Sequence, residues 1–265
     1  MQIAKVQPGR GHRGARLAPR ALPRLLDIRL ALYDDPHSEY SAKVKVALRG
    51  KGIDFDLLSL PCGSSRSPEY LALNPLGKIP ALVVTNIRTG AKDVVVESEV
   101  ILEYLEDLQL PGAAPLLPVE PLARSKARLI SRYHDLYLEP ALRRLYSQVA
   151  PATRDDGVVA EAVPALLARL SELQSLLPDL PGRAFALTSE AEGLGFADCG
   201  YPGALLYAEL ILAALGVPGG LEYERLGLGR IGRWREALWG HEGVRAVLAE
   251  LRPAAEEWVE GKLRS

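Results

Sequence analysis

Residues 74–85 read NPLGKIPALVVT, and this stretch decides how the first part of the chain folds. Ile79 to Thr85 is a β-rich run with Pro80 near its start, where a missing N–H removes no hydrogen bond from the sheet. Asp93 to Val96 is a second β-rich run, and the Thr-Gly turn between the two runs predicts a hairpin. A proline at the head of a strand leaves the preceding backbone groups available to bind an extended peptide edge-on. Taken alone, an ordinary proline-rich turn is the simpler interpretation.

The segments around this hairpin alternate between strand and helix patterns. Five of them are clear: strands at 28–33 and 54–60, and helices at 41–51, 67–73 and 98–108. The helix between the first two strands is a crossover, which makes those strands parallel. The predicted order is therefore βαβ, a short helix and then ββα, which is a mixed sheet with helices on its faces.

The composition changes near residue 110. Residues 109–120 are rich in Pro, Gly and Leu and are interpreted as a linker, and no clear strand pattern follows them. Helical spacing is found at 121–149, 158–177, 197–215, 229–240 and 242–263. Pro164 either kinks the second of these helices or marks its true start. We therefore predict a small α/β domain at 28–108 and an all-helical domain at 121–265.

Length, composition and charge exclude several classes of protein. A chain of 265 residues suits one large domain or two ordinary ones. Its 48% apolar and 25% charged residues exclude a wholly disordered, collagenous or coiled-coil chain. A net charge of −1 gives no basic excess, so no nucleic-acid partner is expected. The most apolar stretch, 201–217, contains Pro, Glu and Gly and is interpreted as a buried helix rather than a membrane span.

Residues 1–27 form a basic extension. The first 26 residues carry Lys5 and several arginines without any acidic residue, and Pro and Gly interrupt every regular element, which predicts a disordered tail. An organelle transit peptide is the alternative, because the stretch is Arg-rich, although it lacks Ser and Thr. Cys62 and Cys199 are too few for a disulfide framework. With no secretory signal, they favour a reducing compartment and hence the cytoplasm.

Glu97 and Ser98 stand where the 93–96 strand runs straight into the 98–108 helix. The free N–H groups of a helix start, together with the serine hydroxyl, make an anion site suited to a carboxylate. Glu97 beside them is suited to an ammonium group. A carboxylate and an ammonium side by side describe the head of an α-amino acid. A plain helix cap is the alternative role of Ser98, and the two roles are compatible.

Ser38 stands at the entrance of the first helix. Its hydroxyl either caps that helix or donates to a bound anion, and capping alone is the simpler interpretation. Tyr33, near the end of the first strand, is a weaker candidate for the same donor role. Cys199 is interpreted as a core residue and His134 as a solvated residue on a helix surface. No pair of histidines has the spacing of metal ligands, so no metal is expected.

Together these segments resemble the glutathione S-transferase family, whose N-terminal domain is thioredoxin-like and whose C-terminal domain is helical. The likeness covers roughly residues 28–263. It rests on NPLGKIPAL at 74–82, ESEVILEYLE at 97–106, GFAD at 195–198, RWREAL at 233–238 and HEGVRAVL at 241–248. Gly195 stands where the family usually has Ser or Thr, so Asp198 is expected to cap its helix alone. The resemblance implies glutathione as co-substrate, no metal and a homodimer.

The resemblance also implies a role for each residue of the glutathione site. Pro80 matches the family's cis-proline, and Ile79 would pair its backbone with the cysteinyl part of glutathione. Glu97 and Ser98 match the pair that holds the γ-glutamyl head. Lys78 lies where some classes contact a carboxylate of the tripeptide.

Ser38 stands seven residues before Lys45, which is the spacing of the catalytic serine in the serine-type classes (tau- and zeta-like) and of the cysteine in the omega-like class. A serine favours conjugation over disulfide-type thiol transfer. The implied function is a glutathione transferase that conjugates the thiolate to small, electrophilic, largely apolar substrates, as in detoxification. Two alternatives stay open: a specialised glutathione-dependent isomerase, dehalogenase or ether-cleaving lyase, and a non-catalytic glutathione-binding or assembly module. The zeta-like Ser-Ser-Cys signature is absent, which weakens the isomerase.

Overall fold

The computed structural model describes residues 27–178, 184–188, 193–217 and 220–265. Four strands form one mixed sheet in the order β2-β1-β3-β4: β1 (Ile28–Tyr33), β2 (Asp56–Leu58), β3 (Ala81–Asn86) and β4 (Lys92–Val96). β1 pairs in parallel with β2 and antiparallel with β3, and β3 forms the predicted hairpin with β4. β2 is shorter than the predicted strand at 54–60, because it lies at the sheet edge and pairs with β1 at only three positions.

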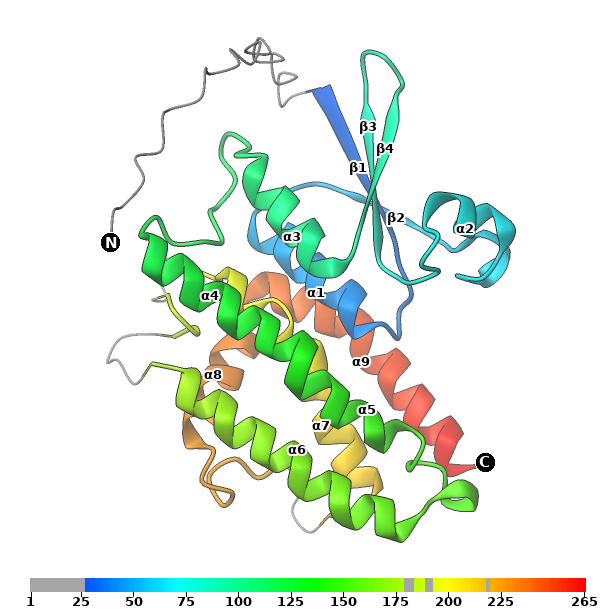
Figure 1. Ribbon diagram of the computed structural model, residues 1–265, viewed down its shortest axis with the longest axis vertical. Coiled ribbons are helices and arrows are strands. Elements are labelled where there is room, and N and C mark those ends of the chain that lie inside the picture. The colour runs from blue at the N-terminus through cyan, green and yellow to red at the C-terminus, as the bar shows by residue number, and fades with distance from the viewer. Residues whose placement is uncertain (1–26, 179–183, 189–192, 218–219) are drawn as a thin grey trace, which may run out of the picture.

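Three helices accompany the sheet: α1 (Glu39–Gly50), α2 (Pro68–Leu73) and α3 (Ser98–Asp107). α1 and α3 lie between the sheet and the helical part of the molecule, whereas α2 lies on the other side of the sheet (Figure 1). The predicted apolar face of α1 is fully buried, with Val44, Ala47 and Leu48 all at 0% exposure. α1 packs against α3, α7 and α9, so it is the central helix of the molecule.

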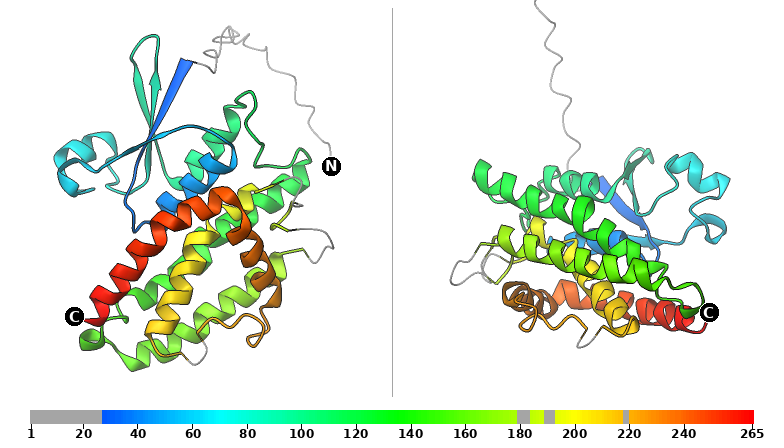
Figure 2. Two further views of the ribbon diagram at one scale, coloured as in Figure 1. Left: turned by 180° about the vertical axis from the view of Figure 1, so that it is seen from behind. Right: turned by 60° about the horizontal axis from the view of Figure 1, so that its bottom comes forward.

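The rest of the described chain is helical (Figure 2). Its main elements are α4 (Pro121–Tyr133), the π-helical turn η3 (His134–Leu138), α5 (Glu139–Tyr146), α6 (Asp156–Leu176), α7 (Tyr201–Ala214), α8 (Gly229–Gly240) and α9 (Glu242–Leu263). Short 3₁₀ turns are formed by η2 (Pro61–Gly63), η4 (Pro151–Thr153) and η5 (Phe196–Asp198). This agrees with the predicted class, a thioredoxin-like α/β domain followed by an all-α domain.

The predicted helix at 121–149 is not continuous. The π-helical turn η3 separates α4 from α5, which ends at Tyr146. Pro140 follows the turn and has no N–H with which to continue the α-helical hydrogen-bond pattern. A π turn adds one residue to a helical repeat, and such turns are frequent at functional sites. Pro164, by contrast, lies inside α6, which begins at Asp156.

Asp198 ends η5 and organises the start of α7. Its buried carboxylate accepts hydrogen bonds from the N–H of Gly195 at 2.7 Å, the N–H of Ala186 at 2.9 Å and the indole N–H of Trp234 at 2.7 Å. Burial raises the pKa of Asp198 to about 6, against the opposing effect of these donors. Asp198 is thus the cap that the sequence predicts behind Gly195, and it also fixes α8 through Trp234.

α7 is the buried helix predicted at 201–217, and no helix among the described residues is long and apolar enough to cross a bilayer. The predicted tail lies outside the described residues up to residue 26. Asp27 already belongs to the fold, because its carbonyl accepts a hydrogen bond from the N–H of Ile87 at 2.8 Å. The tail, the linker and the exact domain limits stay predictions.

Candidate active site

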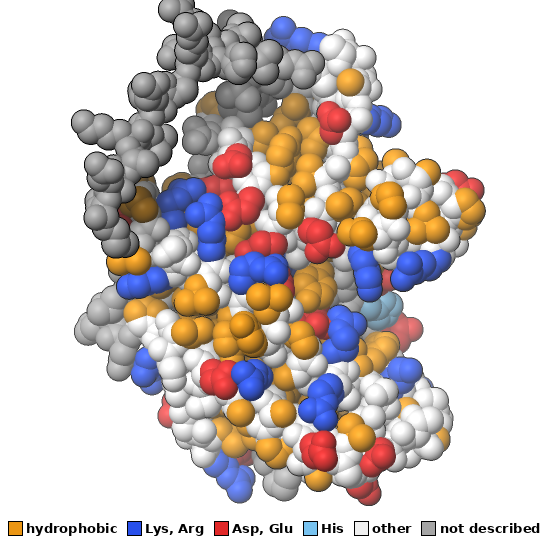
Figure 3. Space-filling view, viewed as in Figure 1, with side chains coloured by type: hydrophobic (Ala, Val, Ile, Leu, Met, Phe, Trp, Pro, Cys, Tyr) orange, Lys and Arg blue, Asp and Glu red, His pale blue; other side chains and the backbone are white. Residues whose placement is uncertain are grey.

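A cleft of about 670 Å³ lies between the sheet and the helical domain. Every site residue predicted from the sequence lines it: Ser38, Lys78, Ile79, Pro80, Glu97 and Ser98. The helical domain contributes Arg132, Asp135, Leu136 and Arg143, and the lining is completed by Tyr40, Ser65, Arg66 and Gly77. In the space-filling view, Lys and Arg side chains lie on both sides of the boundary between the two domains (Figure 3). Another hollow of about 780 Å³, which includes Phe55 and His241, contains none of the predicted residues.

The loop before β3 presents backbone groups to the cleft. The Ile79–Pro80 peptide bond is cis, as the resemblance implies. Tyr70 Oη and Asn74 Nδ2 donate to the carbonyl of Lys78 at 2.6 and 2.7 Å, and these two bonds hold the loop against α2. The backbone of Ile79 makes no hydrogen bond with any other described residue, so both of its polar groups are available to an extended ligand.

Gly77 lets the same loop approach the segment before α2. Its φ of +57° lies in the left-handed region, which favours glycine. A Cβ at this position would lie 2.8 Å from the guanidinium of Arg66 and 3.0 Å from Leu71. The glycine therefore allows the Arg66 side chain to lie close to the loop that carries Lys78 and Ile79.

The junction of β4 and α3 forms the next part of the sheet-domain wall. Ser98 is the first residue of α3 and is 7% exposed. Glu97 precedes it with a φ of 69°, a conformation that is uncommon outside glycine and concentrates at functional positions. Its exposed carboxylate has no partner among the residues that the structure describes. Helix N–H groups, a hydroxyl and an unpaired carboxylate therefore meet at one point, as the sequence predicts for an amino-acid head group.

Ser38 is the N-cap of α1. Its Oγ accepts a hydrogen bond from the N–H of Ser41 at 3.1 Å. A hydroxyl both accepts and donates, so this cap leaves the O–H of Ser38 able to donate into the cleft. Capping and donation, the two roles considered for Ser38, are thus compatible. Tyr33 does not line the cleft, and its ring packs edge-on against Tyr70 at 5.3 Å.

Glu39, the first residue of α1, is 4% exposed. Burial, followed by the nearby carboxylate of Glu139, raises the pKa of Glu39 to about 8. Tyr146 Oη lies 3.4 Å from Glu39 Oε1 and donates to it. The raised pKa favours the protonated, neutral form of Glu39 and so limits the negative charge beside Ser38, where the N–H groups of the helix start favour an anion.

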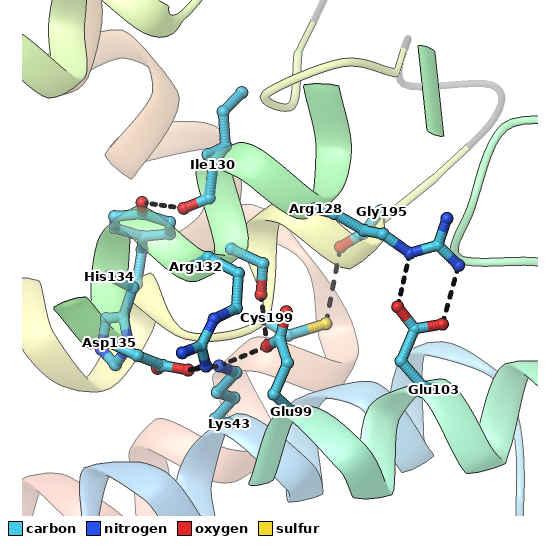
Figure 4. Close-up of polar contacts among 12 residues, drawn as sticks. Lys43, Glu99, Glu103, Arg128, Ile130, Arg132, His134, Asp135, Gly195 and Cys199 are labelled. Atoms are coloured by element: carbon cyan, nitrogen blue, oxygen red, sulfur yellow. Dashed lines mark hydrogen bonds and ion pairs between the residues drawn. The ribbon is translucent and has the colours of Figure 1, made fainter. Parts of the chain in front are cut away.

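A buried ionic network lies behind the cleft and joins the two domains (Figure 4). Lys43 of α1 has a fully buried side chain, and its Nζ lies 2.8 Å from Glu99 of α3 and 2.9 Å from Asp135 of the π-helical turn. Ser131 Oγ donates to Glu99 at 2.8 Å, and Arg132 Nη1 donates to Asp135 at 2.8 Å. This network connects the helix of Ser38, the helix of Ser98 and the helical wall of the cleft.

Asp135 and His134 are neighbours in this network. Burial alone would raise the pKa of Asp135, but the His134 hydrogen bond and the Lys43 charge outweigh it and hold the pKa at about 2. Burial lowers the pKa of His134, whose Nδ1 lies 2.7 Å from Asp135 Oδ1. The prediction of a solvated His134 is wrong, because its side chain is fully buried and packs edge-on against Tyr40 and Tyr201. The sequence gives no sign of the π turn, which changes the residues that face inward.

The two cysteines lie apart from the cleft lining. Cys62 is exposed in the turn η2. Cys199 is buried as predicted, and burial raises the pKa of its thiol. In the described ranges no group of three or more His, Cys, Asp and Glu side chains is arranged to hold a metal ion.

Known proteins share the fold of this chain and the sequence pattern of its first domain. Residues 32–111 match the family model for the N-terminal domain of glutathione S-transferase. Rice GST1, solved in complex with glutathione, is 25% identical and superposes with a TM-score of 0.72 over 89% of this chain and 97% of its own. The first domain of the chain is thus similar in sequence to glutathione S-transferases, and the described fold is similar to theirs over most of the chain. A tau-class glutathione S-transferase from mango shares the fold at 21% identity, with a TM-score of 0.71 over 88% of this chain and 98% of its own.

Curated relatives match shorter segments of the chain. A probable glutathione S-transferase of Zea mays, BZ2, is 34% identical over 56% of this chain and 61% of its own length. A maleylacetoacetate isomerase of Pseudomonas aeruginosa is 38% identical over 37% of this chain and 45% of its own length. The chain thus spans about three fifths or less of these relatives.

Proposed function

We propose that the chain binds glutathione in the cleft and transfers its thiolate to an electrophilic second substrate. The observation that carries this proposal is the meeting of Ser38, the Ile79–Pro80 loop and the Glu97–Ser98 junction in one cleft. These three parts suit a thiol, an extended peptide backbone and an amino-acid head, which glutathione contains in that arrangement. The glutathione-bound rice relative, which shares the fold, supports the same assignment.

The charges of the sheet-domain wall match those of the tripeptide. Glu97 would pair with the γ-glutamyl ammonium, and Ser98 with the N–H groups of α3 would bind the neighbouring carboxylate. Lys78 and Arg66 would bind the glycyl carboxylate. The backbone of Ile79 would pair with the cysteinyl residue, which directs its sulfur towards Ser38.

Ser38 would favour the thiolate over the thiol. A free thiol with a pKa near 8.5 is only about 3% ionised at pH 7, and lowering that pKa by about two units takes about 2.7 kcal/mol. A hydrogen bond to a charged group contributes about 1.5–3 kcal/mol, and a helix start about 0.3–1 kcal/mol. The Ser38 O–H and the start of α1 are therefore sufficient. The thiol proton leaves to water, the sulfur forms a bond to the electrophilic carbon, and the leaving group departs with its bonding electrons.

The test is conjugation of glutathione to 1-chloro-2,4-dinitrobenzene, with Ser38→Ala as the variant. We expect a roughly ten- to hundredfold lower rate at pH 7, and a smaller loss at pH 9, where glutathione ionises unaided. Ultraviolet absorbance of the bound thiolate, measured from pH 5 to 9, gives the pH at which half of the bound thiol is ionised. This pH should be higher in the variant. Cys62→Ser is the control, because this thiol is exposed outside the cleft.

Two results would count against this mechanism. No saturable binding of millimolar glutathione in isothermal titration would remove the proposed function as a whole. An unchanged thiolate midpoint in Ser38→Ala would move the activating role to another group, with Tyr40 as the first alternative because it lines the cleft.

Glutathione-dependent isomerisation is the second candidate. The maleylacetoacetate isomerase similarity, which covers only part of each chain, favours it. A panel of aryl halides, dienoates, haloalkanes and aryl ethers separates the candidates, because an isomerase converts a dienoate without consuming glutathione. Dehalogenation and ether cleavage consume it, with release of halide or of an alcohol.

We also propose a homodimer built on the face of α3 and α4. Hydrophobic side chains gather over α4 on the face seen in Figure 3. Val100, Leu122 and Leu129 are 53%, 61% and 51% exposed, which is unusual for apolar residues on neighbouring helices. Sedimentation of Leu129→Glu should give a smaller species than the wild type. Detoxification and a cytoplasmic location stay predictions.

A further inference from the structure

The helical wall of the cleft carries two arginines. Arg132 from the end of α4 and Arg143 from α5 both line the cleft, with side chains that are 44% and 58% exposed. Leu136 lies on the same wall, and Tyr40 of α1 also lines the cleft. The helical wall therefore combines two cationic groups with the carboxylate of Asp135 and an apolar side chain, and Tyr40 adds an aromatic ring from α1.

Both guanidinium groups are held in place by carboxylates of the helical domain. Arg132 donates to Asp135 at 2.8 Å, and Asp135 is itself held by the buried Lys43. Arg143 pairs with the buried carboxylate of Glu139, and its guanidinium carbon lies 5.7 Å from the ring centre of Tyr146. A guanidinium has five N–H donors, so each arginine keeps donors for a ligand after making these contacts.

The cationic groups of this wall and its surroundings are each matched by a carboxylate. Asp135 is shared between Lys43 and Arg132, while Glu99 is the other partner of Lys43, so these four groups balance. Burial raises the pKa of Glu39 and favours its neutral form, so Glu139 is the main negative charge beside Arg143. Each arginine is thus paired with one carboxylate, and it can bind an anion through the N–H donors on its exposed side rather than through a net positive charge of the wall.

The charged groups of glutathione would pair with residues of the sheet-domain wall. Glu97, Ser98, Lys78 and Arg66 match its ammonium and both of its carboxylates, as described above. Arg132 and Arg143 lie on the helical domain and are not required for any of these contacts. The two arginines are therefore available to bind the second substrate.

We propose that the second substrate carries a carboxylate beside its electrophilic carbon, and that Arg132 and Arg143 bind this carboxylate. Arginine binds carboxylates through paired N–H donors, and a guanidinium held in advance loses less entropy on binding. Leu136 and Tyr40 would contact the apolar body of the substrate. The inference rests on the proposed function and narrows its expected substrates from apolar electrophiles to anionic ones with an apolar body.

The test compares 4-chloro-3,5-dinitrobenzoate with its neutral amide, 4-chloro-3,5-dinitrobenzamide. Each enzymatic rate is divided by the uncatalysed rate with glutathione at the same pH, which removes the difference in intrinsic reactivity. We expect a higher normalised kcat/KM for the benzoate in the wild type. Arg143→Gln and Arg132→Gln should each raise the KM of the benzoate at least tenfold, with the KM of the amide and of glutathione nearly unchanged. Arg144→Gln is the matched control, because Arg144 neighbours Arg143 in the sequence but pairs with Glu161 outside the cleft.

A binding measurement keeps the inference testable without turnover. Isothermal titration compares the conjugate of glutathione with the benzoate and the corresponding amide conjugate. Tighter binding of the carboxylate conjugate, lost in Arg143→Gln, supports the inference.

Two results overturn the inference but leave the glutathione site in place: equal binding of the two conjugates, or equal losses of kcat/KM for benzoate and amide in both variants. A rise only in the KM of glutathione also overturns it, because the arginines then serve the tripeptide. Failure of both conjugates and of glutathione to bind removes the proposed function itself.

Discussion

The two walls of the cleft are built in different ways. The sheet-domain wall consists of short continuous segments: a loop that ends in a cis-proline, a strand that turns directly into a helix, and a helix cap. The helical wall consists of single side chains on α4, η3 and α5, and their direction depends on a π turn and on the buried ion pairs of Lys43. Local sequence therefore determines the wall that suits glutathione, whereas tertiary packing determines the wall that we propose to bind the second substrate.

The largest expected effect comes from Asp198, which supports the helical wall from within its own domain. Asp198→Ala would leave three buried donors, on Gly195, Ala186 and Trp234, without an acceptor. Each such loss costs about 1–3 kcal/mol, so we expect unfolding in urea to show a loss of roughly 3–5 kcal/mol.

Asp155→Ala is the control for this measurement. Asp155 also caps a helix, α6, but it is exposed, and it accepts from Gly157 and Val158 where water can replace it. Its loss should cost about 1 kcal/mol. Equal losses for the two variants would mean that the Asp198 network contributes no more than an ordinary cap.

The next effect tests the connection between the two walls. Lys43→Met would leave Glu99 and Asp135 buried without their shared cation. Removing one partner of a buried ion pair lowers the free energy of unfolding by about 3–5 kcal/mol. The loss should be smaller here, because the two carboxylates lie at the edge of the cleft and can rearrange. Arg128→Met is the matched control, because Arg128 of α4 and Glu103 of α3 also join the two domains, but through a partly exposed pair at 2.5 Å that should contribute about 1 kcal/mol or less.

The same variant should change the response to acid. In the wild type the pKa of Asp135 is held at about 2, below its ordinary value of 3.8. The folded protein therefore binds this proton less readily than the unfolded chain, so the stabilisation is present above pH 4 and is lost as the pH falls towards 2. Lys43→Met should flatten this part of the stability profile. Parallel acid profiles for the variant and the wild type would contradict the role of Lys43.

The smallest effect concerns the sheet-domain wall. Glu97→Gln removes the charge expected to pair with the ammonium of glutathione. Glu97 is exposed, so the pair should contribute about 1 kcal/mol or less, and isothermal titration should give a roughly fivefold higher Kd. Glu103→Gln serves as the control on the same helix. Glu99 is unsuitable for that purpose, because it is buried against Lys43. An equal change for Glu97→Gln and Glu103→Gln would remove the specific role of Glu97.

The sequence predicts the sheet, most helices and one wall of the cleft, because each depends on residues close together in the chain. The strand at 28–33, the hairpin and the position of Ser38 at its helix start are all confirmed. The burial of His134, the inward position of Lys43 and the cleft positions of Arg132 and Arg143 are missed. Helical periodicity assigns charged residues to the surface. It does not predict a π turn, and it does not show an ion-pair partner that is distant in the sequence.

The accessibility of Cys62 gives a practical route to observing the cleft. The chain contains only two cysteines, and Cys199 is buried, so a maleimide dye should attach at Cys62 alone without any engineering. Cys62 lies three residues before Ser65 and four before Arg66, which both line the cleft. A fluorophore on this turn would therefore report ligand occupancy as a change in emission, and stopped-flow mixing would give association and release rates for glutathione, which steady-state rates do not resolve.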